Sequence, residues 1–241
     1  MKIAVIQTGL YYEKGGSTSS FYDDISDFLK YNPDVDLVVF SENKLYGYKN
    51  AYNRRLLDNL MSDITHDSLN KKHAFLFNFH GYRNINNVVS MYSYNDDELI
   101  NQKTVLIPFI EKKGLFDVYE PLFSDFLWKD KNIRRKLINF DGTRIDTYIC
   151  YDALFPVFRS ERNNITITQS NYRLLDNGWG NDRLKKNGSI LGWFSTGINS
   201  SAYINVQDSG GTVIIRENGQ IDKKAFSLSK EAPFFIADLR F

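Results

Sequence analysis

The N-terminal third of the chain alternates short apolar runs with amphipathic stretches. The opening run at residues 1–7 and the run at 36–40 have the length and composition of strands, and the second suits a strand that is buried on both faces. Between them, apolar residues at 21–29 recur every three or four positions, which predicts a helix that ends before Pro33. The same spacing predicts a second helix around 56–64. Strands that alternate with helices are typical of an α/β protein.

Further along the chain, strands follow one another. Strands are predicted at 74–79, 88–94, 143–151, 165–168, 190–195, 201–206 and 212–216. Turns are predicted at 95–97, 210–211 and 218–219, where Asn, Asp and Gly residues gather. The chain has no internal repeat, low-complexity tract or Pro-rich linker, so we expect one domain, residues 1–241, with the layers of an α/β sandwich.

Composition and charge narrow the class of protein. Apolar residues make up 42% of the chain and charged residues 24%, as in globular proteins. The 30 basic and 29 acidic residues leave no basic excess for a phosphate backbone, so nucleic acid is not an expected partner. No segment approaches ~18 consecutive apolar residues, and the opening run is too short for a signal peptide. We therefore expect no membrane span and a cytoplasmic location.

Neither a disulfide nor a metal site is expected. The single cysteine excludes an internal disulfide and a metal site made of cysteines alone. His66, His73 and His80 recur every seven residues, but they do not form a His-Glu-x-x-His motif. Neither one strand nor one helix face can hold all three, because a polar pair and an apolar run lie between them. We expect no metal and no other cofactor.

Three residues with reactive side chains lie next to predicted strands. Glu42 follows the run at 36–40, Lys103 precedes another apolar run, and Cys150 lies near the end of a predicted strand. Strand ends are where side chains converge on a ligand in open α/β sheets. Taken singly, each residue also has an ordinary structural interpretation: a capping Glu, an exposed Lys and a small buried Cys.

The sequence around these residues carries three linked motifs. The strings FSENKLYGY at 40–48, KTVLIPFIE at 103–111 and ICYDALFP at 149–156 resemble, in this order, the contexts of the catalytic Glu, Lys and Cys of the nitrilase superfamily of carbon–nitrogen hydrolases. The second and third strings are most similar to those of the catalytic domain of apolipoprotein N-acyltransferases. Two downstream segments, QSN at 169–171 and STGINS at 195–200, are also similar to segments of the family.

The resemblance implies a fold and a mechanism. The family fold is a four-layer α-β-β-α sandwich that often pairs into a homodimer or a larger assembly through its helices. By this resemblance Cys150 is a nucleophile that forms a thioester, Glu42 is the base that accepts the thiol proton, and Lys103 stabilises the oxyanion.

Two supporting residues follow from the same motifs. The backbone N–H of Tyr151 would be a second donor to the oxyanion. Glu111 resembles a second carboxylate of the family, which positions the catalytic lysine and the substrate. The alternative for Glu111 is a surface salt bridge with Lys112 or Lys113.

The resemblance predicts a thiol hydrolase that cleaves a non-peptide C–N bond of a small amide. Two alternatives stay open: an N-acyltransferase that passes the acyl group to an amine, and a catalytically degenerate binding or scaffold protein. The chain departs from the family at Ser41, where Pro is usual. The string RLKKNGS at 183–189 also lacks a Glu and an Arg that are typical of the acyltransferases. The membrane helices of the lipoprotein enzymes have no counterpart in this sequence, which favours hydrolysis or a partner that supplies the lipid.

Overall fold

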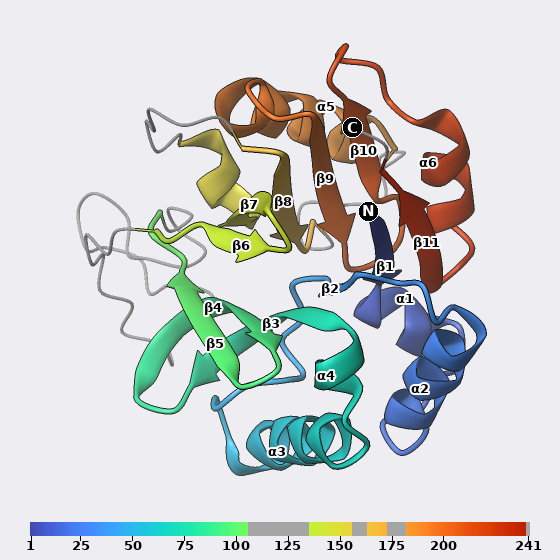
Figure 1. The fold of residues 1–241 in the computed structure, drawn as a ribbon, viewed down its shortest axis with the longest axis vertical. Coiled ribbons are helices and arrows are strands. Elements are labelled where there is room, and N and C mark those ends of the chain that lie inside the picture. The colour runs from blue at the N-terminus through green and yellow to red at the C-terminus, as the bar shows by residue number, and fades with distance from the viewer. Residues whose placement is uncertain (106–134, 156–162, 173–181, 240–241) are drawn as a thin grey trace, which may run out of the picture.

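Two β-sheets lie face to face, and helices cover the outer face of each (Figure 1). The computed structural model of the 241-residue chain describes residues 1–105, 135–155, 163–172 and 182–239. The strands are β1 (Lys2–Ile6), β2 (Leu37–Phe40), β3 (Ala74–Tyr82), β4 (Ile85–Tyr94), β5 (Asp97–Gln102), β6 (Ile138–Phe140), β7 (Thr143–Ile149), β8 (Ile165–Ser170), β9 (Ala202–Gln207), β10 (Val213–Arg216) and β11 (Phe234–Asp238). The arrangement confirms the four-layer α-β-β-α sandwich.

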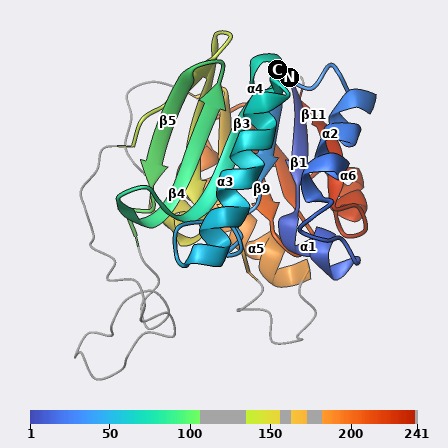
Figure 2. The same ribbon diagram turned by 90° about the horizontal axis from the view of Figure 1, so that it is seen from below.

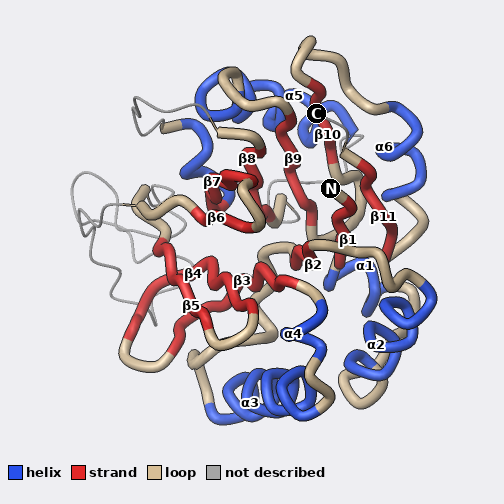
Figure 3. The backbone as a smooth tube through the Cα atoms, viewed as in Figure 1, coloured by secondary structure: helices blue, strands red, loops and turns tan. Residues whose placement is uncertain are grey.

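The helices form the two outer layers. They are α1 (Thr8–Glu13), α2 (Phe21–Tyr31), α3 (Ala51–His66), α4 (Leu69–Lys72), α5 (Asp182–Gly192) and α6 (Lys223–Ser229), with a 3₁₀ turn η1 (Cys150–Leu154) and a π-helical turn η3 (Trp193–Gly197). Figure 2 shows α2 and α3 outside the first sheet, and the tube in Figure 3 shows the strands enclosed between the helical layers.

Each sheet has a parallel centre and antiparallel edges. The strand order is β11-β1-β2-β3-β4-β5 in the first sheet and β10-β9-β8-β7-β6 in the second. β1, β2 and β3 are parallel to one another, with Val5 opposite Val39, and so are β7, β8 and β9. The carboxyl ends of the parallel strands therefore lie at one edge of their sheet, the usual place for a ligand site in α/β proteins.

Alternate residues of each strand face different apolar layers. On β3, Phe75, Phe77 and Phe79 pack on the helix side, whereas Ala74 and Leu76 pack between the two sheets. The rings of Phe75 and Phe77 are stacked with their centroids 5.3 Å apart. Because both faces of β1 and β2 are buried, their sequences are nearly continuous apolar runs, whereas the buried strand β8 alternates Ile with Thr.

The strand predicted at 190–195 is wrong, because this segment is helical and completes α5 and η3. Leu191 and Phe194 face outward, 56% and 66% exposed, while Trp193 packs against a buried cluster with Tyr203. The inner face of α5 also carries a small polar residue: Ser189 is buried, and its Oγ accepts a 2.9 Å hydrogen bond from Asn205 Nδ2. An apolar run that faces solvent in part therefore misled the strand prediction.

The other predicted strands and both predicted helices are confirmed, with ends that shift by a few residues. The turn between β4 and β5 is also confirmed: Asn95 has a φ of +52°, a left-handed conformation that Asn tolerates well. The sequence analysis did not find α1, α4, α5, α6, β6 or β11. Across the described ranges, no helix combines the length and the apolar character needed to cross a bilayer.

Candidate active site

The ends of three strands carry the side chains that the sequence analysis selected. Glu42 lies two residues beyond β2, Lys103 directly follows β5, and Cys150 directly follows β7. β5 runs in the same direction as β3, since both are antiparallel to β4. All three residues therefore lie just beyond the carboxyl ends of their strands.

Glu42 and Lys103 lie close together, and both are buried. They are 5% and 1% exposed, and the distance from Glu42 Oε1 to Lys103 Nζ is 3.7 Å. The second carboxylate oxygen, Glu42 Oε2, accepts a 3.1 Å hydrogen bond from the backbone N–H of Asn171, which follows β8. The ammonium group and the backbone donor offset part of the solvation that the carboxylate loses on burial.

His80 also belongs to this cluster, although the sequence analysis gave it no role there. Its Nε2 lies 3.7 Å from Glu42 Oε1. Burial and, to a smaller extent, the charge of Lys103 lower the pKa of His80 to about 3, so the ring is neutral at neutral pH. His80 lies near the carboxyl end of β3, so the strand-end argument that selected Glu42 could have selected it too.

The three histidines lie in separate surroundings. His66 is exposed on α3, and His73 donates a 2.7 Å hydrogen bond from Nδ1 to the Val35 carbonyl. Only His80 lies beside the buried Glu42. Within the parts of the chain that the structure describes, no three His, Cys, Asp or Glu side chains are grouped to hold a metal ion.

Cys150 begins a tight turn rather than ending a strand. β7 ends at Ile149, and Cys150 is the first residue of η1, with a φ of +49° that costs ~1–2 kcal/mol for a residue other than glycine. The thiol is buried and packs with Val88 and Ile149. The carbonyl of Val88 accepts a 2.9 Å hydrogen bond from the backbone N–H of Lys103. Val88 therefore connects the turn of Cys150 to the strand end at Lys103.

Asp152 fastens these two segments to each other. Its Oδ1 accepts hydrogen bonds from the backbone N–H groups of Thr104, at 3.1 Å, and Val105, at 2.6 Å. Its Oδ2 accepts a 2.6 Å bond from Arg135 Nη2, and both side chains of this ion pair are buried. Burial raises the pKa of Asp152, and the charge of Arg135 opposes this shift. One carboxylate on η1 thus fixes the backbone that follows Lys103.

The aromatic ring of Tyr172 packs against the turn that holds Cys150. Its ring packs with the cluster of Val88, Ile149 and Cys150. Its hydroxyl accepts a 3.4 Å hydrogen bond from Asn205 Nδ2, and burial raises its pKa, so the hydroxyl stays neutral. In the sequence, Tyr172 directly follows the segment 169–171 and stands where the related family usually has Asp, but this departure alone did not indicate a place at the site.

The remaining predicted residues divide into described and undescribed ones. Tyr151 lies in η1 next to the thiol, and its ring packs edge-on against Phe155 with the centroids 5.1 Å apart. Glu111 lies outside the described residues, so its role stays a prediction. The segment 169–171 lies at the site through Asn171, whereas 195–200 runs from η3 into the turn before β9.

Comparisons with known proteins bear on the fold. No protein-family model matches the sequence, and no curated protein matches it. Among solved structures, a carbon-nitrogen hydrolase from Helicobacter pylori G27 is 14% identical with a TM-score of 0.63, over 92% of this chain and 83% of that one. A mutant of the Nesterenkonia AN1 amidase from the nitrilase superfamily is 12% identical with a TM-score of 0.61, over 100% and 92% of the two chains.

A third neighbour extends the same result. Saccharomyces cerevisiae Nit3, a member of branch 10 of the nitrilase superfamily, is 14% identical with a TM-score of 0.52, over 92% of this chain and 84% of that one. These similarities concern the superfamily, and the closer resemblance to apolipoprotein N-acyltransferases stays a prediction. The chain has the fold of the nitrilase superfamily of carbon–nitrogen hydrolases.

Proposed function

We propose that this protein is a thiol hydrolase that cleaves a non-peptide C–N bond of a small amide, with Cys150 as the nucleophile. The observation that carries the proposal is the pair of buried opposite charges, Glu42 and Lys103, 3.7 Å apart, with Lys103 joined to the cysteine turn through Val88. A base and a fixed positive charge are what a thiol needs to attack an amide carbonyl.

In the first half-reaction, Cys150 Sγ bonds to the amide carbonyl carbon while its proton passes to Glu42. The carbonyl oxygen gains the negative charge, which Lys103 and the backbone N–H of Tyr151 stabilise. The C–N bond then breaks, the nitrogen takes the proton from Glu42, and ammonia or an amine leaves. Cys150 is left as a thioester.

In the second half-reaction, water attacks the thioester carbon while Glu42 accepts a proton from the water. The C–S bond breaks, the thiol regains that proton, and a carboxylic acid leaves. The neutral state of His80 supports this assignment, because a neutral ring beside Glu42 leaves Lys103 as the positive charge of this cluster. An amine in place of water would give acyl transfer from the same thioester.

The test uses the one cysteine of the chain, which makes any thiol adduct unambiguous. The protein and its Cys150→Ala variant are incubated with a panel of primary amides and acyl donors, quenched in acid and measured by intact mass. We expect an acyl adduct on the native protein only, and its mass would give the acyl group. Adding an amine to the thioester then separates transfer from hydrolysis.

One joint result would contradict the proposal. If no donor gives a Cys150-dependent adduct, and iodoacetamide alkylates Cys150 as slowly as an inert buried thiol, the enzyme assignment fails. The protein would then be a binding or scaffold member with the same fold. Lys103→Met is the informative companion variant, since it removes the positive charge and should slow alkylation if the cluster activates the thiol.

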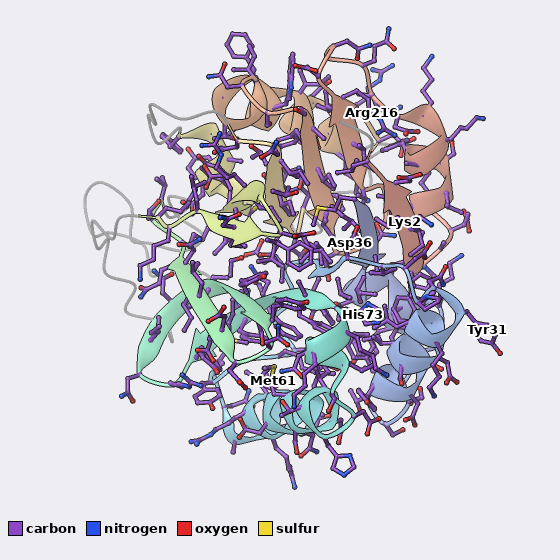
Figure 4. The ribbon with its side chains drawn as sticks, viewed as in Figure 1. Lys2, Tyr31, Asp36, Met61, His73 and Arg216 are labelled. Carbon is purple, nitrogen blue, oxygen red and sulfur yellow. The ribbon has the colours of Figure 1, made fainter. Side chains whose placement is uncertain are left out.

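We further propose that two copies pair through the outer face of α5 and η3. Leu191, Phe194 and Ile198 recur along this face and are exposed, which leaves an apolar strip on a helix. A two-fold dimer would place one strip against the other. We expect Leu191→Glu to lower the mass measured by light scattering to that of a monomer. Tyr31→Glu is the control, because Tyr31 is 87% exposed and projects from the end of α2 (Figure 4).

A further inference from the structure

Asp208, a second buried carboxylate, lies at the carboxyl end of β9, and the sequence analysis gave it no role. It is 2% exposed. Its Oδ1 accepts three hydrogen bonds of 2.9 Å, from the backbone N–H of Gly9, from Ser41 Oγ and from Asn43 Nδ2. Its Oδ2 accepts a 3.1 Å bond from Asn171 Nδ2. One carboxylate therefore joins residues that follow β1, β2 and β8.

Three of these four donors surround Glu42. Ser41 and Asn43 are its neighbours in the chain, one on each side. Asn171 binds Asp208 with its side chain and Glu42 Oε2 with its backbone N–H, at 3.1 Å. The backbone of Glu42 and the donor to one of its oxygens are thus both held by the same carboxylate.

The contacts of Asp208 indicate a carboxylate that is held in one orientation. Its four side-chain hydrogen bonds come from neutral donors, and burial is the largest influence on its pKa, which is raised, while the donors oppose that shift. The fit against α1 is tight, because a Cβ at Gly9 would lie 2.3 Å from Asp208 Oδ2. The carbonyl of Asp208 also accepts a 2.8 Å hydrogen bond from the backbone N–H of Leu10.

We propose that Asp208 is a positioning residue for Glu42. The inference rests on the proposed role of Glu42 as the base. Through Ser41, Asn43 and Asn171 it fixes the rotation of the Glu42 carboxylate, with Oε2 on the backbone donor and Oε1 toward Lys103. A general base acts only within hydrogen-bond reach of its proton, and a misplacement of ~1 Å costs about 10²-fold in rate.

The inference also accounts for the departure at Ser41, where the related family usually has Pro. A proline has no side-chain donor, whereas Ser41 Oγ donates to Asp208 and accepts a 3.1 Å hydrogen bond from the backbone N–H of Thr8. In this chain a serine–aspartate bond fixes the residue before Glu42. The serine at position 41 therefore takes part in the hydrogen-bond network that positions Glu42.

The test measures how fast iodoacetamide alkylates Cys150 as pH changes, since this reaction needs no known substrate. Below the usual thiol pKa of about 8.5 most of the thiol is protonated, so alkylation is faster where a neighbouring base takes the proton. Glu42→Gln should therefore slow alkylation at about pH 6 by tenfold or more and have little effect at about pH 9.5. We expect Asp208→Ala to reproduce this pH-dependent loss.

Two further variants make the result specific. Asp208→Asn should recover part of the rate, because the amide oxygen can still accept from Ser41 and Asn43, whereas its NH2 group cannot accept the Asn171 bond. Asp146→Asn is the matched control: Asp146 is a buried carboxylate of β7 that bonds the Tyr148 hydroxyl, at 3.1 Å, and should leave the pH profile unchanged. Thermal unfolding of each variant identifies any that fail to fold. If Asp208→Ala does not fold, Ser41→Ala gives the same readout with a smaller loss.

The outcomes separate the inference from the proposed function. A profile of Asp208→Ala equal to that of the native protein, while Glu42→Gln changes it, overturns the positioning role alone. A loss of equal size at every pH also overturns it, since that result reports general damage to the site. If Glu42→Gln itself leaves the profile unchanged, Glu42 is not the base, and both the proposed mechanism and the inference fail.

Discussion

Replacing Arg135 with methionine tests the most deeply buried ion pair of the site. The Arg135 guanidinium lies between Asp152, at 2.6 Å, and the ring of Tyr148, with its central carbon 4.0 Å from the ring centroid. The side chains of Arg135 and Asp152 are 2% and 0% exposed. Methionine keeps an unbranched stem against Tyr148 but leaves the carboxylate buried without its cation.

The size and pH dependence of the effect follow from this geometry. Removing one partner of a buried ion pair costs about 3–5 kcal/mol. Burial raises the pKa of Asp152 above its unfolded value, and the charge of Arg135 opposes that shift, so the variant raises the native pKa further. The native state of the variant then binds a proton that the unfolded state releases. Its free energy of unfolding therefore falls as pH rises from the unfolded pKa of about 3.9 through the native one.

The measurement is urea unfolding, followed by circular dichroism, of the native protein and the variant at about pH 5 and pH 8. We expect the larger loss at the higher pH. Arg83→Met is the matched control, because Arg83 also lies over a tyrosine ring and pairs with Glu98 at 3.1 Å, but its side chain is 61% exposed. That change should cost at most about 1 kcal/mol. An Arg135→Met loss no larger than this, or larger at pH 5, would refute the reasoning.

Two further predictions concern His80 and the loop that packs on it. Because the pKa of His80 is lowered to about 3, its ring resonances in long-range ¹H–¹⁵N spectra should not move between about pH 8 and pH 5, and a titration in that range would contradict its burial. The same shift makes folding less favourable as pH falls below the ordinary histidine pKa of about 6.5, since only the unfolded ring takes up a proton. Gly47→Ala should lower the free energy of unfolding by more than about 2 kcal/mol, because Gly47 has a φ of +150° and its Cβ would lie 2.2 Å from the His80 carbonyl oxygen. Gly142→Ala, at a φ of +76° in open space, carries only the backbone cost, so equal losses would contradict the packing argument.

The layers of the fold were predictable where the buried strands are continuous apolar runs. The runs at 36–40 and 74–79 became β2 and β3, and the helix that ends before Pro33 became α2. The failure at 190–195 has the opposite cause, since there Ile190, Leu191 and Phe194 are exposed and Ser189 is buried. The spacing of apolar residues in the sequence predicts which residues are buried only where the buried face of the element is also its apolar face.

The site was predictable only in part. The positions of Glu42, Lys103 and Cys150 at strand ends could be inferred from local sequence and family resemblance. The contacts of Asp208 join residues that are far apart in the chain, so the spacing of residues in the sequence does not predict these contacts. Arg135 escaped prediction for the same reason, because its partner Asp152 is fixed by the turn after β7 rather than by sequence proximity.

The left-handed backbone of Cys150 reverses an ordinary rule of protein engineering. At most positions, alanine is more favourable than glycine by ~0.5–1 kcal/mol, because glycine loses more conformational freedom on folding. At a φ of +49° the order inverts, and glycine is the residue that the backbone accepts without strain. Glycine would relieve this backbone strain, although it would also remove a buried side chain that packs with Val88 and Ile149, and it is the change that deletes the proposed nucleophile. A directed-evolution search at this position must screen for activity as well as for melting temperature.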